Sequence, residues 1–561
     1  MATSSNGSGS DPGPEGEIAD PTGAEVVDPA PRPGLTGAVR GAMGGDEHAD
    51  HRNILGNTGQ NVLGLGIGAA ATFVAQVLMT RTLGDARYGV VTLATQFAFI
   101  AAAATRFGMD VADVRLVAIL IGRGEAGRVR GLVRRSVAIA GAVSVTFGIA
   151  SFFASPWMAR TFSELPAIAT PAFQAAAIGI PLGALAFTYM GATRGLKIMR
   201  YTLYAQWTAQ PIGWIVLSLA GWAVVADSAG VTTMAFTLSW GLALVIAWWG
   251  WQKQSRGFVQ VPTGKGIPEE ETRSLLRFGA LRAPATLFSQ LIFWTDFFVL
   301  SALSGGQGAV SAAQVGIYGA ALRAAQSLFL FLTSVSLTFS PFVADLHHRG
   351  EHDKLDGLYK SVTRWTLAAT IPVLLVLAIL PGPVLHIFGA DFTQGEDALR
   401  ILIIGMIAPV LVGTVGFILI MVGRTGWDLC VYLGGFAIDI GLAYALIPSL
   451  GIKGAAIAQA ATLTASAGAR LLLVRRFVHI WPFDRHFLRL LTPAAMGAAV
   501  MVGASLVIPD ARWFADLVIA GGLGVVVYVV TLLLFGLAPA ERRMVVTVMR
   551  KITGRGAAPA A

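Results

Sequence analysis

Apolar stretches of about twenty residues, separated by short polar loops, fill most of the chain. A helix of that length crosses the roughly 30 Å hydrocarbon core of a bilayer, so each stretch predicts a membrane-spanning helix. About fourteen are expected, near residues 58–80, 88–109, 133–154, 171–192, 202–224, 232–251, 279–301, 314–340, 365–384, 398–421, 428–448, 453–473, 490–508 and 514–536. The pattern predicts an all-α polytopic membrane protein.

Composition strengthens this prediction. Hydrophobic residues make up 55% of the 561-residue chain and charged residues only 13%, whereas soluble domains carry about 25% charged residues. Cys430 is the only cysteine, which excludes an intramolecular disulfide. The cysteine therefore indicates nothing about the redox compartment.

Two similar segments indicate an internal repeat. Tyr88-Gly and Tyr318-Gly each follow a glycine-bearing loop and an apolar span. Six helices come before the second copy, which therefore begins in the same orientation as the first. A parallel repeat of this kind predicts a site between two lobes. We predict a six-helix N-lobe at 53–252, a cytoplasmic inter-lobe loop at 253–278, a six-helix C-lobe at 279–475, and two extra helices at 476–540.

The two ends of the chain differ from the apolar body. Residues 1–52 are rich in Gly, Pro and Ser, with nine acidic residues against three arginines. They contain too few apolar groups to offset the entropy of ordering, so we predict a disordered cytoplasmic tail. They also lack the basic and apolar regions of a signal peptide. Residues 541–561 are predicted to be a basic cytoplasmic tail.

The distribution of Lys and Arg predicts the orientation. With the amino terminus placed inside, 32 of the 41 basic residues lie in inner segments, six lie in outer loops, and three lie within spans. This asymmetry follows the positive-inside rule and predicts a multi-pass protein of the cytoplasmic membrane with both termini cytoplasmic. The net charge of +9 is then a sign of topology and of attraction to lipid headgroups, and nucleic acid is not an expected partner.

Charged side chains inside the apolar spans are the strongest functional signal. Each costs at least about 2.5–3.5 kcal/mol on insertion scales, so such residues usually face a cavity or a partner. Arg106 and Arg282 lie at similar depth near the cytoplasmic ends of the second and seventh spans, within the first helix pair of each lobe. They are candidates for binding a phosphate bidentately in a cavity between the lobes. The alternative is that both extend to the inner headgroups.

A second set of charges lies deeper. Asp296 and Arg323 stand at similar depth on adjacent predicted helices and form a candidate ion pair. This pair is either structural, or one member is released when substrate phosphate or a proton competes for the other. Arg282, Ser289, Phe293 and Asp296 are expected to share one face of their helix, because steps of 7, 11 and 14 residues each return within about 40°.

Asp439 lies near the middle of its span with no basic residue at helical spacing. It is either protonated or binds a cation, which makes it a candidate for ion coupling, with a permanently neutral acid as the alternative. Several amides lie in or near spans and either line a sugar-accepting cavity or join neighbouring helices: Gln60, Asn61, Gln76, Gln206, Gln210, Gln290 and Gln459. The candidate substrate-binding residues are Arg106, Arg282, Arg323 and Gln290.

No pattern predicts a cofactor. Gly264-Lys-Gly lacks the frame of a phosphate-binding loop, and His347, His348 and His352 near Asp353 indicate a solvated loop more simply than a metal site. We expect neither a cofactor nor a metal. The expected energy source is an ion gradient, with H⁺ or Na⁺ left open, the membrane potential or the substrate gradient.

Several motifs carry a family resemblance. They are Arg81-Thr-Leu-Gly-Asp-Ala-Arg-Tyr-Gly, Leu276-Arg-Phe-Gly-Ala, Thr295-Asp-Phe-Phe-Val-Leu-Ser, Val315-Gly-Ile-Tyr-Gly-Ala-Ala-Leu-Arg, Ser340-Pro-Phe, Ile387-Phe-Gly-Ala-Asp-Phe and Gly451-Ile-Lys-Gly-Ala-Ala-Ile-Ala. In order and spacing, over about 55–540, the chain resembles Wzx-like polysaccharide flippases of the multidrug/oligosaccharidyl-lipid/polysaccharide exporter superfamily.

The resemblance implies a non-enzymatic transporter that moves a polyprenyl-pyrophosphate-linked oligosaccharide from the inner to the outer leaflet for cell-surface polysaccharide synthesis. Its implied partners are this lipid-linked saccharide, membrane lipids and polysaccharide-assembly proteins. Three alternatives stay open: a multidrug/cation antiporter of the same superfamily, an integral membrane polymerase or glycosyltransferase, and a scaffold with a regulatory tail. The Arg-weighted spans disfavour a cationic substrate, and the short outer loops disfavour an enzyme.

Overall fold

The computed structural model describes residues 47–536 except 197, 258–268, 307–309, 330, 334, 337–342, 344–345, 348 and 509–511, and it places side chains from residue 66 onward. Residues 1–46 and 537–561, which hold most of both predicted tails, lie outside the described residues, as does His348. The chain divides into two units, 1–57 and 58–561. Both lobes belong to the second unit.

The described residues form helices, turns and loops, with no strand among them, which confirms the all-α prediction. The helices are α2 (Glu47–Thr105), α3 (Met109–Gly122), α4 (Ala126–Phe162), α5 (Pro166–Gly195), α6 (Arg200–Thr202), η1 (Leu203–Ala209), α7 (Gln210–Val224), α8 (Ala229–Ser255), α9 (Glu269–Leu291), α10 (Thr295–Gly306), α11 (Ala312–Gln326), α13 (His352–Ile379), α14 (Pro381–His386), η2 (Ala390–Gly395), α15 (Glu396–Val412), α16 (Val415–Met421), α17 (Thr425–Leu450), α18 (Ile452–Val478), η3 (Phe487–Leu490), α19 (Leu491–Ser505), α20 (Trp513–Ala515), η5 (Asp516–Gly521), α21 (Gly522–Thr531) and η6 (Leu532–Gly536).

Within the described part of the chain, ten helices are long and apolar enough to cross a membrane, or up to twelve if each of two bent pairs is one span. The expected number was fourteen. α2 covers two expected spans and contains a non-helical residue, Gly84 (φ 74°, ψ 178°). The expected span 202–224 is divided among α6, the π-helical η1 and α7. These two features account for the lower number, because each leaves a predicted span without a separate long helix.

Helix starts follow ordinary capping chemistry. Ser311 caps α11 with its hydroxyl on the backbone of Gln314, whose side chain accepts from the backbone of Ser311 in return, which is a capping box. Ser228 caps α8 in the same way through Val231, and a proline at the first turn begins α5.

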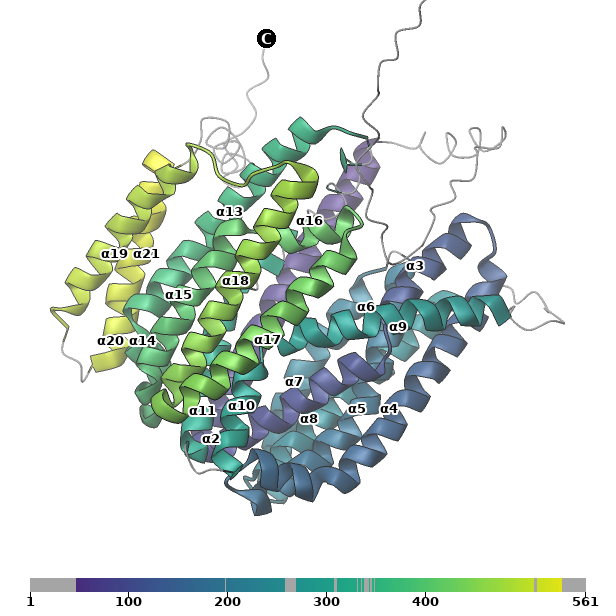
Figure 1. Ribbon diagram of the computed structural model, residues 1–561, viewed down its shortest axis with the longest axis horizontal. Helices are drawn as coiled ribbons and strands as arrows, with labels where there is room; N and C mark the ends of the chain where they lie inside the picture. The colour runs from purple at the N-terminus through teal and green to yellow at the C-terminus, as the bar shows by residue number, and fades with distance from the viewer. Residues whose placement is uncertain are drawn as a thin grey trace, which may run out of the picture. The chain divides into compact units, whose positions relative to one another are not determined.

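The helices form two groups that contact each other (Figure 1). In the N-lobe, α5 lies between α4 and α8, and α3 packs on α5. In the C-lobe, α18 packs on α15 and α17, and α13 packs on α15. The last helices, α19 and α21, contact each other and α13. Lipid-facing side chains on these helices are exposed and apolar, as expected for a protein whose solvent is hydrocarbon.

One predicted helix is broken. The span expected at 279–301 consists of two helices bent by 64° between Leu275–Leu291 and Thr295–Ser304. The first part packs toward the N-lobe, where Leu275 joins a buried cluster with Met109, Val117 and Trp251. The second part, α10, contacts α17 of the C-lobe and α4 of the N-lobe. The prediction of one continuous helix was wrong because tertiary contacts draw its two ends toward different neighbours.

The lobes touch at the ends of the helices near Gly84. The Arg81 guanidinium donates to the carbonyls of His386 (2.8 Å) and Ile387 (2.9 Å), and a Glu164 carboxylate oxygen accepts from the Ala312 backbone at 2.7 Å. Between them, Gly316 lies so close to the backbone of Asp85 that a Cβ would be 1.9 Å from its carbonyl oxygen. We call the contact of Gly89 with Gly316 the glycine seam. It closes this end of the space between the lobes.

Candidate functional site

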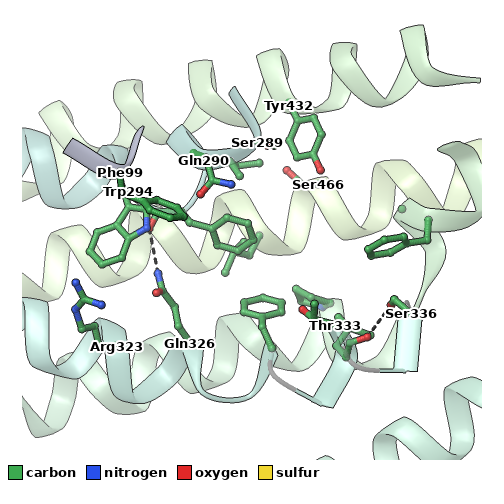
Figure 2. Close-up of a pocket in the computed structure, with 18 of the residues that line it drawn as sticks. Phe99, Ser289, Gln290, Trp294, Arg323, Gln326, Thr333, Ser336, Tyr432 and Ser466 are labelled. Carbon is green, nitrogen blue, oxygen red and sulfur yellow. Dashed lines mark hydrogen bonds between the residues drawn. The ribbon is translucent and has the colours of Figure 1, made fainter. Parts of the chain in front are cut away.

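A cavity of about 790 Å³ lies between the two lobes. Its N-lobe wall comes from α2, η1, α7 and α8, and its C-lobe wall from α9, α11, α15 to α18 and the segments that join them. Figure 2 shows Arg323, Trp294 and Gln326 together at one end, and Thr333 and Ser336 at the other. The volume lies in the usual range for ligand pockets, about 300–1,000 Å³.

Two of the predicted arginines line this cavity without an ion-pair partner. Arg282 and Arg323 form no salt bridge with a described residue, and the Nε of each is buried without a hydrogen-bond acceptor. The Arg323 guanidinium lies 5.2 Å from the centroid of the Trp294 ring and within hydrogen-bonding reach of the Tyr88 hydroxyl. Both residues are half-buried, and a guanidinium partly withdrawn from water without a carboxylate is favourable for a ligand that supplies the negative charge.

Arg470 is a third cavity arginine, which the sequence-based analysis did not select. Its Nε donates to Asp428 Oδ1 at 2.9 Å, and its guanidinium lies 4.4 Å from the centroid of the Tyr432 ring. Asp428 and Arg470 stand at the same ends of consecutive predicted helices. The depth argument applied to Asp296 and Arg323 would have found this pair.

The predicted ion pair of Asp296 with Arg323 does not form. The Tyr318 hydroxyl donates to Asp296 Oδ2, and the Asp296 backbone N–H donates to Asp439 Oδ2 at 3.2 Å. Asp296 is fully buried and is not among the residues that line the cavity. The break before Thr295 is the reason, because it rotates Asp296 off the face that carries Arg282, Ser289 and Phe293, all of which line the cavity.

Asp439 therefore has a neighbour that its own helix did not reveal. It is buried beside Asp296. One carboxylate oxygen of Asp296 and one of Asp439 have no hydrogen-bond donor. Two buried carboxylates at this spacing resist simultaneous ionisation, so the pair can hold a proton or a cation.

Arg106 lies outside the cavity lining. Its Nε is 3.1 Å from Asp110 Oδ1, and its guanidinium is 4.6 Å from the centroid of the Phe187 ring. Arg194 approaches the other oxygen of Asp110 at 3.9 Å. The i, i+4 spacing of Arg106 and Asp110 was the available signal for this pair. Arg106 and Arg282 are thus not brought together on one cavity wall.

Some of the predicted amide side chains line the cavity and others do not. Gln76, Gln206, Gln210 and Gln290 line the cavity. Gln459 is fully buried outside it, and the side chains of Gln60 and Asn61 lie outside the described residues. The cavity lining also contains Gln96 and Gln326. Together with the arginines, these groups offer many hydrogen-bond donors.

The electrostatics of the cavity favour an anion. Among the described residues that line it, three are arginines and none is acidic. The charge of Arg470 is balanced by Asp428, which leaves two guanidiniums for a ligand. Planar guanidiniums bind phosphate oxygens with two parallel hydrogen bonds. The arrangement suits a phosphate-bearing ligand with a polar, uncharged remainder.

Comparisons with known proteins bear on the family and the fold of this chain. A family model described as polysaccharide biosynthesis protein matches residues 54–347. Stage V sporulation protein B of Bacillus subtilis (strain 168) is 33% identical over 89 residues, which are 16% of this chain and 17% of that protein.

Two solved structures share the fold. One is an inward-facing multidrug resistance MATE family transporter of the MOP superfamily, with a TM-score of 0.62 and 16% identity over 75% of this chain and 98% of that one. The other is the lipid II flippase MurJ in an inward closed conformation, with a TM-score of 0.61 and 14% identity over 83% and 97%. The expected resemblance to a polysaccharide-synthesis family is confirmed by the family model, and the two solved structures confirm the fold. Because the family model matches more than half of the chain, this multi-pass membrane protein belongs to the polysaccharide biosynthesis protein family.

Proposed function

We propose that this protein is a flippase that moves a polyprenyl-diphosphate-linked saccharide from the inner to the outer leaflet of the cytoplasmic membrane. The observation that carries the proposal is the inter-lobe cavity, in which Arg282 and Arg323 have no ion-pair partner among the described residues and no acidic residue lines the wall. A diphosphate would supply the missing negative charge. The lipid tail would stay in the bilayer while the headgroup crosses.

The transport step is alternating access, in which the lobes rock about the bound headgroup. With both termini cytoplasmic, the glycine seam lies at the outer side, and its closure supports a state that receives substrate from the inside. Release then requires the seam to open. Arg81 and Glu164 hold that end closed through backbone groups of the opposite lobe, so opening costs hydrogen bonds that water can replace.

Energy for the cycle would come from ions bound at Asp296 and Asp439. Their adjacent buried carboxylates support the binding of H⁺ or Na⁺. Tyr318 ties Asp296 to α11, which also carries Arg323. An ion bound at Asp296 is thereby coupled through one helix to a cavity arginine. This makes the protein a secondary transporter rather than an enzyme, with polysaccharide-assembly proteins as its expected partners.

The two alternative functions, an antiporter and a membrane enzyme, require different sites from a flippase. A multidrug/cation antiporter needs a cavity that is both acidic and aromatic. This cavity is aromatic, but the charged residues that line it in the described part of the chain are arginines, and Asp296 and Asp439 lie outside the lining. A membrane polymerase or glycosyltransferase needs acceptor and donor sites in outer loops. No described feature favours either alternative over a flippase.

The test is lipid analysis by mass spectrometry in the source organism after the protein is depleted. Cells would be rescued with wild type, Arg282→Ala, or Arg256→Ala as a matched control, because Arg256 is an exposed arginine outside the cavity. We expect a polyprenyl-linked saccharide to accumulate on depletion, and to fall to the normal level with wild type and Arg256→Ala but not with Arg282→Ala.

Two outcomes would overturn the proposal. Depleted cells without any lipid-linked intermediate but with greater sensitivity to cationic dyes would support the antiporter instead. Accumulation of a shortened saccharide lacking its last sugars would instead point to an enzyme that extends the chain. Immunoblots of membrane fractions would verify that all variants are made in equal amounts.

A further inference from the structure

The two walls of the cavity differ in charge. All ten N-lobe residues that line it are uncharged, while the C-lobe wall carries the three arginines. The N-lobe residues are Thr72, Gln76, Gln96, Phe99, Gln206, Trp207, Gln210, Trp214, Phe236 and Trp240. Four glutamines and three tryptophans on one wall are a distinct chemical surface, which we call the amide–indole wall. Any headgroup that fills the cavity must contact both walls.

The glutamines of this wall retain unused hydrogen-bonding groups. Gln76 accepts from the Tyr88 hydroxyl at 2.8 Å, yet its Nε2 is buried without a partner. Gln210 donates to Ser239 at 3.2 Å through Nε2, which leaves its carbonyl oxygen for a ligand. The Gln96 and Gln206 side chains form no hydrogen bond with a described residue. Each amide can therefore donate to or accept from a bound molecule.

The aromatic residues of the wall are held in fixed positions. The Trp214 indole donates to the Thr232 carbonyl at 3.1 Å and lies 5.0 Å from the Phe236 ring. Trp240 lies 5.0 Å from the Phe187 ring. Fixed aromatic faces carry negative potential and pack well against the polarised C–H groups of sugar rings. They offer no counter-charge for a carboxylate.

The helix that presents two of these side chains is irregular. Gln206 and Trp207 lie in η1, a single π-helical segment between α6 and α7. Such segments are frequent at functional sites because the wider turn changes the direction of side chains. Gly68 lets α2 approach η1, since a Cβ there would lie 2.2 Å from the Trp207 carbonyl oxygen. This close packing places Trp207 on the wall.

We propose that the saccharide part of the substrate binds to the amide–indole wall and is uncharged, while the diphosphate binds to Arg282 and Arg323. The inference rests on the proposed function and names the chemical class of glycan. Amides bind hydroxyl and N-acetyl groups without leaving a charge unpaired. A uronate would place an ionised carboxylate on a wall without a cation, where its desolvation is not compensated.

The charge balance of the whole cavity leads to the same glycan class. The charge of Arg470 is balanced by Asp428, so the two remaining guanidiniums match one diphosphate. A second acidic group on the sugar would have no arginine left. The substrate is therefore a diphosphate-linked neutral saccharide, whose orientation in the cavity is set by the opposite chemistry of the two lobes.

The test uses the purified full chain in lipid nanodiscs and three probes, with bound probe measured by native mass spectrometry. The probes share one polyprenyl diphosphate and carry no sugar, a neutral N-acetylhexosamine disaccharide, or a disaccharide with one uronic acid. We expect the neutral probe to bind about tenfold more tightly than the uronate probe, the effect of one uncompensated polar contact.

Variants assign the preference to the wall. Gln206→Leu should weaken binding of the neutral glycosylated probe and leave binding of the bare diphosphate probe unchanged. Arg282→Ala should weaken binding of all three probes. Gln206→Arg should invert the preference toward the uronate probe. Gln252→Leu, on α8 outside the cavity lining, is the matched control. Thermal unfolding of the purified variants verifies that they are folded.

The outcomes separate the two proposals. Equal or tighter binding of the uronate probe by wild type, or unchanged binding of the neutral glycosylated probe by Gln206→Leu, would overturn the neutral-glycan inference and leave the flippase intact. If none of the three probes binds and depleted cells accumulate no lipid-linked saccharide, the proposed function fails and the inference fails with it.

Discussion

Two tyrosines at matching places in the repeat have different partners. Tyr88 of the N-lobe donates to the amide oxygen of Gln76 at 2.8 Å, whereas Tyr318 of the C-lobe donates to the carboxylate of Asp296. Both are fully buried. The repeat thus keeps a hydroxyl at the same place in each lobe and changes the group that it binds. One lobe is neutral at this position and the other is titratable.

The remaining charges follow the same division. The N-lobe has buried charges, but they form ion pairs: Arg106 and Arg194 both approach Asp110. Next to them, Ser136 donates to Asp113 at 2.6 Å, and burial raises the pKa of Asp113 well above its ordinary value. The C-lobe leaves Arg282 and Arg323 without partners. We infer that N-lobe charges stabilise the fold and that C-lobe charges bind the substrate.

The largest expected effect distinguishes an arginine needed for transport, Arg323, from an arginine needed for stability, Arg106. Arg323→Ala should lower transport about hundredfold, because two charge-assisted hydrogen bonds are worth about 3 kcal/mol. Arg106→Ala should instead lower the melting temperature by several degrees, since it removes one partner of a buried ion pair. The measurements are lipid-linked saccharide accumulation in depleted cells and thermal unfolding of the purified variants. Loss of transport per folded molecule in Arg106→Ala would contradict the division between the lobes.

The next largest effect is expected when the N-lobe tyrosine, Tyr88, is given an acidic partner like that of Tyr318 in the C-lobe. Gln76→Glu places a carboxylate beside Tyr88, which also contacts Arg323. Attraction between the new carboxylate and the Arg323 guanidinium is worth about 2 kcal/mol at an effective dielectric constant of about 20. Because the carboxylate then competes with the diphosphate for this guanidinium, binding of the bare polyprenyl diphosphate should weaken about thirtyfold. Gln76→Met keeps the length without the charge and should retain most of the binding. Equal losses in the two variants would show that the charge of Arg323 is not what binds the anion.

A smaller effect tests the titratable lobe. Asp439→Asn should abolish the increase in transport rate that an ion gradient causes, because Asp439 lies beside Asp296. Binding of the probes should be unchanged, because Asp439 lies outside the cavity lining. A coupling free energy of about 1.4 kcal/mol corresponds to about tenfold in rate. Flux in proteoliposomes with a pH or a Na⁺ gradient measures it and identifies the ion. Asp397→Asn, a surface carboxylate paired with Lys453, is the control. Persistent gradient dependence in Asp439→Asn would exclude this site as the coupling site.

Sequence alone located several residues of the cavity lining. Charges inside apolar runs stand out against their surroundings, so Arg282, Arg323 and Gln290 could be assigned to a cavity before any helix was placed. Depth along a helix follows directly from residue number. The direction of a side chain around the helix axis does not, and Arg106 illustrates this limit.

The pairing of the acids could not be predicted because it depends on a break in a helix. Residues 292–294 read Ile-Phe-Trp, and nothing in their propensities ends a helix. Both parts pack on α17, but α9 also packs on α3, whereas α10 packs on α4 and α11, and the bend accompanies these different contacts. It turns Asp296 from the cavity to Asp439, which is 143 residues away in sequence. Long-range packing of this kind leaves no local pattern.

The smallest expected effect concerns the glycine seam, where Gly89 of the N-lobe contacts Gly316 of the C-lobe. A Cβ on Gly316 would lie 1.9 Å from the Asp85 carbonyl oxygen, whereas one on Gly89 would lie 2.8 Å from the Gly316 nitrogen. Overpacking of about 1 kcal/mol shifts the closed seam toward opening about fivefold, more for Gly316→Ala than for Gly89→Ala.

The readout is the labelling rate of a cysteine placed at Thr92, which is buried and near Gly319, in a Cys430→Ser background that removes the native thiol. Gly441→Ala is the control, since no heavy atom lies within 4 Å of the added Cβ. Faster labelling in Gly316→Ala than in Gly441→Ala would support the seam as the closure between the lobes. Equal rates would mean that Arg81 and Glu164 hold this end closed without the glycines. The two lobes would then be joined by polar contacts alone, and the small residues would serve only helix packing.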